Sequence, residues 1–139
     1  MDASYLQGLI GEWNESLLRI SEQESMAVVG SKWTRKQLLG HLIDSALNNY
    51  QRFVRLQQGN LAGFPGYDQE FWVVAGDYNQ CSWMNLVDLW RLFNLQISSL
   101  IQHIPSGCEE NIWEGHDVNL GFLVQDYPRH MLHHLIRIV

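Results

Sequence analysis

Three histidines, His41, His130 and His134, are the residues of this sequence best suited to hold a metal ion. An α-helix turns by about 100° per residue, so side chains four positions apart, such as His130 and His134, differ in direction by only about 40°. A third imidazole from a facing helix would complete three nitrogen ligands for one divalent cation. Three protein ligands leave one position open for water or substrate, which is typical of reactive rather than structural metal sites.

The spacing of the two C-terminal histidines also has simpler explanations. The sequence contains 6 histidines, and such a number produces this spacing by chance in some chains. His130 could instead pair with His133, three positions away, although the helical wheel places His133 away from the apolar stripe. We therefore treat the metal site as a hypothesis, with a partly solvated helix end as the alternative.

The position of His41 allows two interpretations. On a helix it shares a polar stripe with Ser45, Asn48 and Arg52. The stripe could be a solvated face. It could also be a polar cleft with His41 at one end and Arg52 about three turns away. Periodicity alone does not distinguish the two.

The composition predicts one globular domain over residues 1–139. Hydrophobic residues make up 46% of the sequence and charged residues 17%, which argues against disorder. The formal net charge of −6 argues against a nucleic-acid partner, because such proteins usually present a basic face to phosphates. The two cysteines, Cys81 and Cys108, lack the spacing of a zinc or redox motif.

The N-terminal sequence does not resemble a signal peptide, because it lacks both a basic start and an apolar run. No apolar stretch approaches the roughly 20 residues that span a bilayer. We therefore expect a cytoplasmic protein with no membrane partner.

The apolar residues recur with a helical period along almost the whole chain, and we find no alternation typical of strands. Capping residues and helix-stopping residues divide this pattern into four helices and predict an all-α fold. The predicted helices are an N-terminal one over Leu6–Leu17, a second over Thr34–Gln58, a third from Ser82 to just before Pro105, and a fourth from Asn119 to the C-terminus.

Pro128 lies inside the fourth predicted helix, two residues before His130. Proline removes one backbone hydrogen bond and usually kinks a helix. We therefore expect a kink there, or a helix that restarts near Tyr127.

Residues 60–81 form a long connection between the second and third predicted helices. A connection of this length is often functional and allows the two helices to run parallel. Tyr67, Asp68 and Trp72 could form part of a lid, although packing is the simpler role for Trp72.

Two blocks of the sequence resemble the DinB/YfiT-like superfamily. Residues 33–45 read WTRKQLLGHLIDS and are similar to its second-helix signature, and residues 129–138 read RHMLHHLIRI and are similar to its closing helix with a HxxxH pair. The resemblance implies a four-helix bundle with a long crossover between helices 2 and 3. It also implies a divalent metal, zinc or nickel, held by His41, His130 and His134, and so favours the cleft interpretation for His41.

The resemblance further implies a metal-dependent hydrolase or a transferase for low-molecular-weight thiols, acting on a small-molecule substrate. A cation held by three neutral imidazoles keeps its full charge and lowers the pKa of a bound water or thiol. The alternative is a non-catalytic bundle that binds a metal or a ligand. A third interpretation, a helical interaction protein, needs no metal.

A hydrolase usually needs a group that moves protons, and Asp44 and Asp68 are the candidates. Asn48 and Arg52 could bind an anionic substrate or the carboxylate of a thiol if their stripe lines a cleft, and Tyr67 could contribute from the crossover. Because helical bundles often pair through exposed apolar faces, a homodimer is a further prediction.

Overall fold

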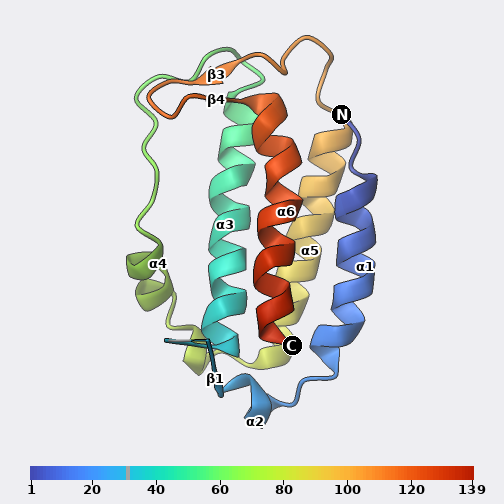
Figure 1. Ribbon diagram of the computed structural model, residues 1–139, viewed down its shortest axis with the longest axis vertical. Coiled ribbons are helices and arrows are strands. Elements are labelled where there is room, and N and C mark those ends of the chain that lie inside the picture. The colour runs from blue at the N-terminus through green and yellow to red at the C-terminus, as the bar shows by residue number, and fades with distance from the viewer. Residues whose placement is uncertain (31) are drawn as a thin grey trace.

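The structure is a computed structural model that describes residues 1–30 and 32–139. Within these residues, four long helices pack side by side as a bundle (Figure 1). The predicted all-α class and four-helix bundle are therefore confirmed. The helices are α1 (Ser4–Leu18), α3 (Arg35–Arg55), α5 (Trp83–Gln102) and α6 (Leu120–Ile138).

The helices α3 and α5 run parallel, whereas α1 and α6 run in the opposite direction (Figure 1). Both α5 and α6 pack against α1 and α3. The chain must cross the full length of the bundle between α3 and α5, and residues 57–82 do so along the outer side of α3. The predicted long crossover is confirmed, and the two helices have the parallel order that it allows.

Polar side chains begin three of these helices where the sequence predicts them. Thr34, Ser82 and Asn119 each accept a hydrogen bond from the backbone N–H three residues ahead, at 3.1, 3.1 and 2.8 Å. At Thr34 the Gln37 side chain also accepts the Thr34 N–H at 3.0 Å, which completes a capping box. These caps satisfy backbone donors that a helix leaves free at its first turn.

Two predicted helix limits change in the structure. The helix α3 ends at Arg55, and Gln58 lies in the bend that follows rather than in the helix. The predicted restart near Tyr127 is wrong, because α6 is continuous across Pro128. Proline removes only one bond of the ladder, and the buried neighbours Tyr127 and Met131 hold both sides of that position in the core.

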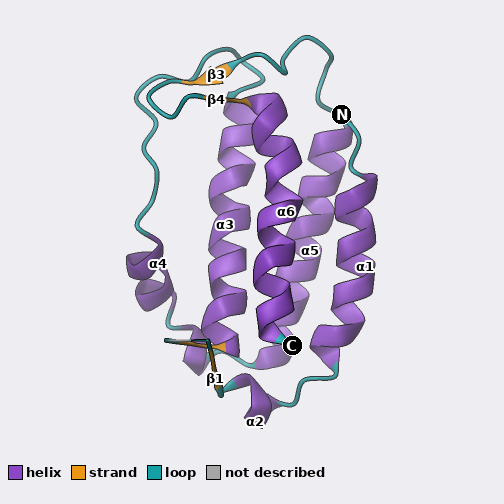
Figure 2. Cartoon of the chain, in the orientation of Figure 1, coloured by secondary structure: helices purple, strands orange, loops and turns teal. Residues whose placement is uncertain are grey.

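The crossover contains a helix that the sequence analysis did not predict. This helix, α4 (Gln69–Gly76), packs beside α3 and is followed by a short 3₁₀ turn, η1 (Tyr78–Gln80) (Figure 2). It is only 8 residues long. Its apolar residues give no clear helical stripe, since just Val73 of this segment is buried.

Short elements close the two ends of the bundle. A four-residue helix, α2 (Glu22–Ser25), follows α1, and two antiparallel pairs of strands lie at opposite ends (Figure 2). Each strand has two residues, which is too short to show an alternating pattern in the sequence. The pairs are β1 (Val28–Val29) with β2 (Trp33–Thr34) and β3 (Ile112–Trp113) with β4 (Val118–Asn119).

Large apolar side chains fill the centre of the bundle, and Trp83, Trp90 and Phe53 are almost completely buried. The Tyr127 hydroxyl donates to Asn94 Oδ1 at 2.6 Å, so this buried polar pair is satisfied within the core. No described helix combines the length and apolar character that crossing a bilayer requires.

A glycine in α3 makes room for the end of the crossover. A Cβ atom at Gly40 would lie 2.1 Å from Cδ2 of Tyr78, far inside van der Waals contact. Tyr78 in turn donates its hydroxyl hydrogen to Asp44 Oδ1. The close approach of η1 to α3 therefore depends on the absence of a side chain at the residue before His41.

We predict that Gly40→Ala destabilises the protein by about 1–3 kcal/mol, because the clash with Tyr78 exceeds the gain in helix propensity. Gly8→Ala in α1 is the matched control, since nothing lies within 4 Å of its added Cβ. Gly8→Ala should stabilise by about 0.5–1 kcal/mol. Urea unfolding of the two variants measures both effects, and equal shifts would contradict the packing described here.

Candidate metal centre

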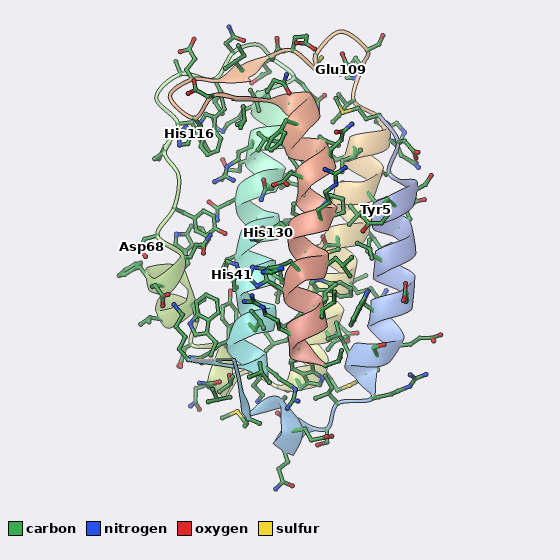
Figure 3. All side chains as sticks on the ribbon, in the orientation of Figure 1. Tyr5, His41, Asp68, Glu109, His116 and His130 are labelled. Carbon is green, nitrogen blue, oxygen red and sulfur yellow. The ribbon has the colours of Figure 1, made fainter. Side chains whose placement is uncertain are left out.

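The three histidines lie together between α3 and α6. His41 comes from α3, His130 and His134 come from α6, and their ligand nitrogens all lie within 4.8 Å of one another. Figure 3 shows His41 and His130 in the space between the two helices. His41 is only 1% exposed, which rules out the solvated-face interpretation of its stripe.

The antiparallel packing of α3 and α6 brings these residues together. His41 lies near the beginning of α3 and His134 near the end of α6, so the two positions fall at the same level of the bundle (Figure 1). The Arg35 Nε–H donates to the Ile138 carbonyl at 2.6 Å and ties the first turn of α3 to the last turn of α6. This bond also satisfies one of the carbonyls that a helix end leaves free.

The spacing of the nitrogens fits a tetrahedral cation. His130 Nε2 and His134 Nε2 are 3.2 Å apart. Two nitrogens about 2.0–2.1 Å from a tetrahedral zinc ion lie about 3.3 Å from each other. The His41 ring centroid is 4.8 Å from that of His134 and 5.8 Å from that of His130, so the third imidazole approaches the same point from α3.

The surroundings keep the three imidazoles neutral. Burial lowers the pKa of His41 to about 4, and the neighbouring His130 lowers it further. Burial, followed by the charges that His130 and His41 would carry, lowers the pKa of His134 to about 3. Burial also lowers the pKa of His130. Neutral imidazoles present the free lone pairs that a metal needs, so the site is ready for a cation at neutral pH.

The histidine rings are held by packing rather than by hydrogen bonds to other groups of the chain. His41 Nδ1 and His134 Nδ1 are buried and have no hydrogen-bond partner among the described residues. Trp33 packs on His41 with 5.1 Å between ring centroids. A buried nitrogen without a partner is costly, and a cation bound to His41 would use a lone pair of this kind.

Two hollows reach the histidines beside the start of α4. A hollow of about 280 Å³ is lined by His130 together with Arg52 and Tyr67, and one of about 240 Å³ is lined by His134 together with Trp33 and Glu70. Gln69, the first residue of α4, lines both hollows. We call the first hollow the His130 cleft. A ligand could approach the three imidazoles through it.

Two of the three predicted substrate-binding residues, Arg52 and Tyr67, line the His130 cleft. Asn48 does not, and its side-chain amide donates to the Asp44 carbonyl at 2.9 Å. Asn49 lines the cleft instead, one position further along α3. A substrate-binding role for Arg52, Tyr67 or Asn48 remains a prediction.

Asp44 is buried on α3 and accepts a hydrogen bond from the Tyr78 hydroxyl. Burial raises the pKa of Asp44 to about 6, against the opposing effect of the Tyr78 hydrogen bond. It lines a third hollow, with Trp72 and Gly76, which includes none of the three histidines. Asp44 lines neither of the two hollows that include a histidine of the cluster.

Asp68 is exposed and caps α4, where its Oδ1 accepts the Phe71 N–H at 3.2 Å. It lies at the start of α4, away from His41 and His130 (Figure 3). Neither hollow that reaches the histidines includes Asp68 among its lining residues. Its proton-handling role remains a prediction that this placement does not favour.

The sequence analysis missed Asp126, an exposed acid that lines the His130 cleft. Its charge opposes the lowering of the His130 pKa, which places it within electrostatic reach of that imidazole. Asp126 and His130 are four positions apart on α6, the same spacing as the histidine pair. That spacing was the signal in the sequence that could have identified it.

The remaining histidines are exposed, and the outward position predicted for His133 is confirmed. His133 faces outward on α6, His103 ends α5, and His116 stacks on Trp113 with 3.5 Å between ring centroids. Cys81 and Cys108 are free thiols.

Comparison with solved structures identifies a similar fold. YfiT from Bacillus subtilis superposes with a TM-score of 0.82, 17% sequence identity, and coverage of 96% of this chain and 81% of that chain. The chain therefore has the four-helix-bundle fold of YfiT. YfiT is described as a probable metal-dependent hydrolase with an unusual four-helix bundle topology. At this level of identity the likeness establishes the fold alone.

Comparisons by sequence find no such similarity. No family model matches the chain, and no match is found among curated proteins. The arrangement of the histidines therefore carries the functional argument.

We predict that burial of His41 makes the metal-free protein sensitive to acid. Its pKa is about 4 in the folded chain and 6.5 ordinarily, so the unfolded chain binds more protons between these values and stability is lost as the pH falls. Wild type should lose about 2 kcal/mol more than His41→Gln between about pH 7.5 and pH 5. Urea unfolding at both pH values measures the difference.

Asp44 acts with the opposite sign. The pKa of Asp44 is raised in the folded chain, so its ionisation destabilises the protein as the pH increases toward 6. Asp44 is present in both wild type and His41→Gln, so this effect cancels when the two proteins are compared. Equal pH dependence in wild type and His41→Gln would contradict the burial of a neutral His41.

Proposed function

We propose that this protein is a metal-dependent enzyme, a hydrolase or a thiol S-transferase, that acts on a small-molecule substrate in the His130 cleft. The observation that carries the proposal is the convergence of three imidazole donors within 4.8 Å at a buried position that two hollows reach. YfiT, which has the same fold, is described as a probable metal-dependent hydrolase.

Zinc or nickel is the expected ion, since both bind imidazole nitrogen well. Bound to His41, His130 and His134, such an ion would supply Lewis acidity, which lowers the pKa of a coordinated water or thiol. The chain's own part is to exclude bulk water around His41, to keep the imidazoles neutral and to direct one side of the site into the cleft.

Asp126 is the group best placed to move protons in this proposal. Of the described carboxylates, it is the one that lines the cleft together with His130. Its exposure leaves the carboxyl group in contact with water, to which a general base must pass the proton it takes up. A small substrate in the cleft would lie between Asp126 and the residues of α3.

A second candidate function is a non-catalytic metal- or ligand-binding protein of the same fold. One observation favours it, namely that neither acid predicted from the sequence lines a hollow that includes a histidine of the cluster. Asp68 caps α4, and Asp44 is bonded to Tyr78 in a separate hollow. Under this alternative the metal is retained and Asp126 has no role.

We predict that untagged protein binds about one equivalent of zinc or nickel, and that His41→Ala, His130→Ala and His134→Ala each weaken binding by at least about 100-fold. Losing a direct ligand should cost more than the roughly 10–100-fold loss seen for outer-shell partners. His133→Ala is the control, because His133 is exposed on the same helix and lies outside the cluster.

Competition with a chromophoric chelator measures the dissociation constants. Metal content that is unchanged in all three ligand variants, or lowered equally in His133→Ala, would remove the assigned site.

We predict that Asp126→Asn reduces metal-dependent turnover by about 100-fold or more while leaving zinc affinity within about threefold, since general base catalysis typically contributes factors of this size. Steady-state assays on a panel of esters, amides and thiol acceptors measure this effect. Glu109→Gln, a change of an acid that does not line the cleft, is the control. Metal binding without turnover across the panel would favour the non-catalytic alternative.

A further inference from the structure

Arg52 is a buried cation that the chain itself does not neutralise. The residue is 9% exposed, and none of the ion pairs in the described part of the chain includes it. Its one described hydrogen bond runs from Nη1 to Asn49 Oδ1 and is long, at 3.4 Å. Burying a charge is unfavourable unless an opposite charge or several hydrogen bonds compensate it.

Most of the donor capacity of Arg52 is unused. A guanidinium group carries five N–H donors, and the buried Nε of Arg52 has no acceptor among the described residues. Burial lowers the pKa of this guanidinium, which reflects the same uncompensated charge. The side chain is thus under-satisfied in both charge and hydrogen bonding.

The position of the guanidinium is fixed by aromatic rings. Its carbon Cζ lies 4.3 Å from the ring centroid of Trp113 and 5.8 Å from that of Tyr67. The Trp113 indole N–H donates to the Phe64 carbonyl at 2.8 Å, and His116 stacks on the same indole. The ring on which Arg52 rests is therefore itself held in place, so the cation is pre-organised.

Arg52 also faces a space that a ligand can enter. It lines the His130 cleft, whose volume of about 280 Å³ suits a small molecule. Ser45, Asn49 and Tyr67 line the same cleft and add hydrogen-bonding groups around the guanidinium. His130, a proposed metal ligand, also lines it.

We propose that Arg52 is the binding site for an oxyanion, a carboxylate or a phosphate, carried by a small molecule in the His130 cleft. A planar guanidinium matches both groups through paired N–H donors and is the residue best suited to them. The assignment of this anion to the substrate of the metal centre rests on the proposed function. The affinity of Arg52 for an oxyanion does not.

The only acid among the described lining residues of the cleft is Asp126, which is exposed and forms no ion pair with Arg52. The cleft therefore carries a positive charge from Arg52 on α3 and an acidic side chain, Asp126, on α6. This arrangement sets the direction of an anionic ligand, whose charged group faces α3 and whose remaining part faces His130.

The experiment titrates metal-free protein at about pH 7.5 with succinate, inorganic phosphate and the uncharged succinamide. The resonance of the Trp113 indole N–H reports binding, because this ring contacts Arg52. We expect saturable shifts with succinate or phosphate, none with succinamide, and a dissociation constant at least about tenfold weaker in Arg52→Gln. The tighter of the two anions identifies the class of substrate.

Arg55→Gln is the matched control, because Arg55 lies on the same helix, is exposed and does not line the cleft. It should bind the anions like wild type. Arg52→Lys keeps the charge without the planar fork and should bind several-fold more weakly, which provides a second test should Arg52→Gln fail to fold. Melting temperatures establish that each variant is folded.

Equal affinity in wild type and both Arg52 variants, binding of succinamide as tight as that of succinate, or no saturation by about 50 mM anion would overturn the proposal. A zinc titration of the same protein distinguishes failure of the Arg52 proposal from failure of the proposed function. Anion binding without zinc binding would retain the Arg52 site and reject the metal enzyme, and zinc binding without anion binding would do the reverse.

Discussion

Three imidazoles occupy one desolvated space between α3 and α6, where none of them can become charged at low cost. Burial holds the pKa of His41 and His134 well below neutrality, and any proton on one ring would repel the next. This constraint explains why the cluster suits a cation, because a divalent ion takes up lone pairs that buried neutral imidazoles otherwise leave unused. It also requires the antiparallel contact of α3 with α6, which the Arg35 bond to the end of α6 holds in register.

The crossover covers the histidine cluster and also lines the two hollows that reach it. Because α3 and α5 run parallel, the chain must return along the outside of α3, and it places α4 beside α3 (Figure 1). The first residue of α4, Gln69, lines both hollows that reach the cluster. On one side the cleft brings together His130, an acid on α6 and an uncompensated arginine on α3. A bundle with simple up-and-down connections would lack this covering segment.

Much of this arrangement could be predicted from the sequence. The caps Thr34, Ser82 and Asn119 act locally, so their side chains mark the helix starts without reference to the rest of the fold. The burial of His41 could not be decided from the wheel, because a polar stripe looks the same whether it faces water or a cleft. The helical wheel also could not decide which of two adjacent asparagines faces the cleft. Asn48 was predicted to do so, whereas Asn49 lines the cleft in the structure. The capping role of Asp68 could not be predicted, because α4 is too short to show a helical period in the sequence.

X-ray absorption at the zinc edge of untagged, zinc-loaded protein tests the central claim most directly. The account predicts a first shell with three imidazole nitrogens at about 2.0–2.1 Å and one exchangeable oxygen ligand from water. That shell should lose one imidazole in His41→Ala, the variant of the residue contributed by the other helix. A shell of oxygen ligands, or a spectrum unchanged by the loss of His41, would show that the three imidazoles do not share one cation.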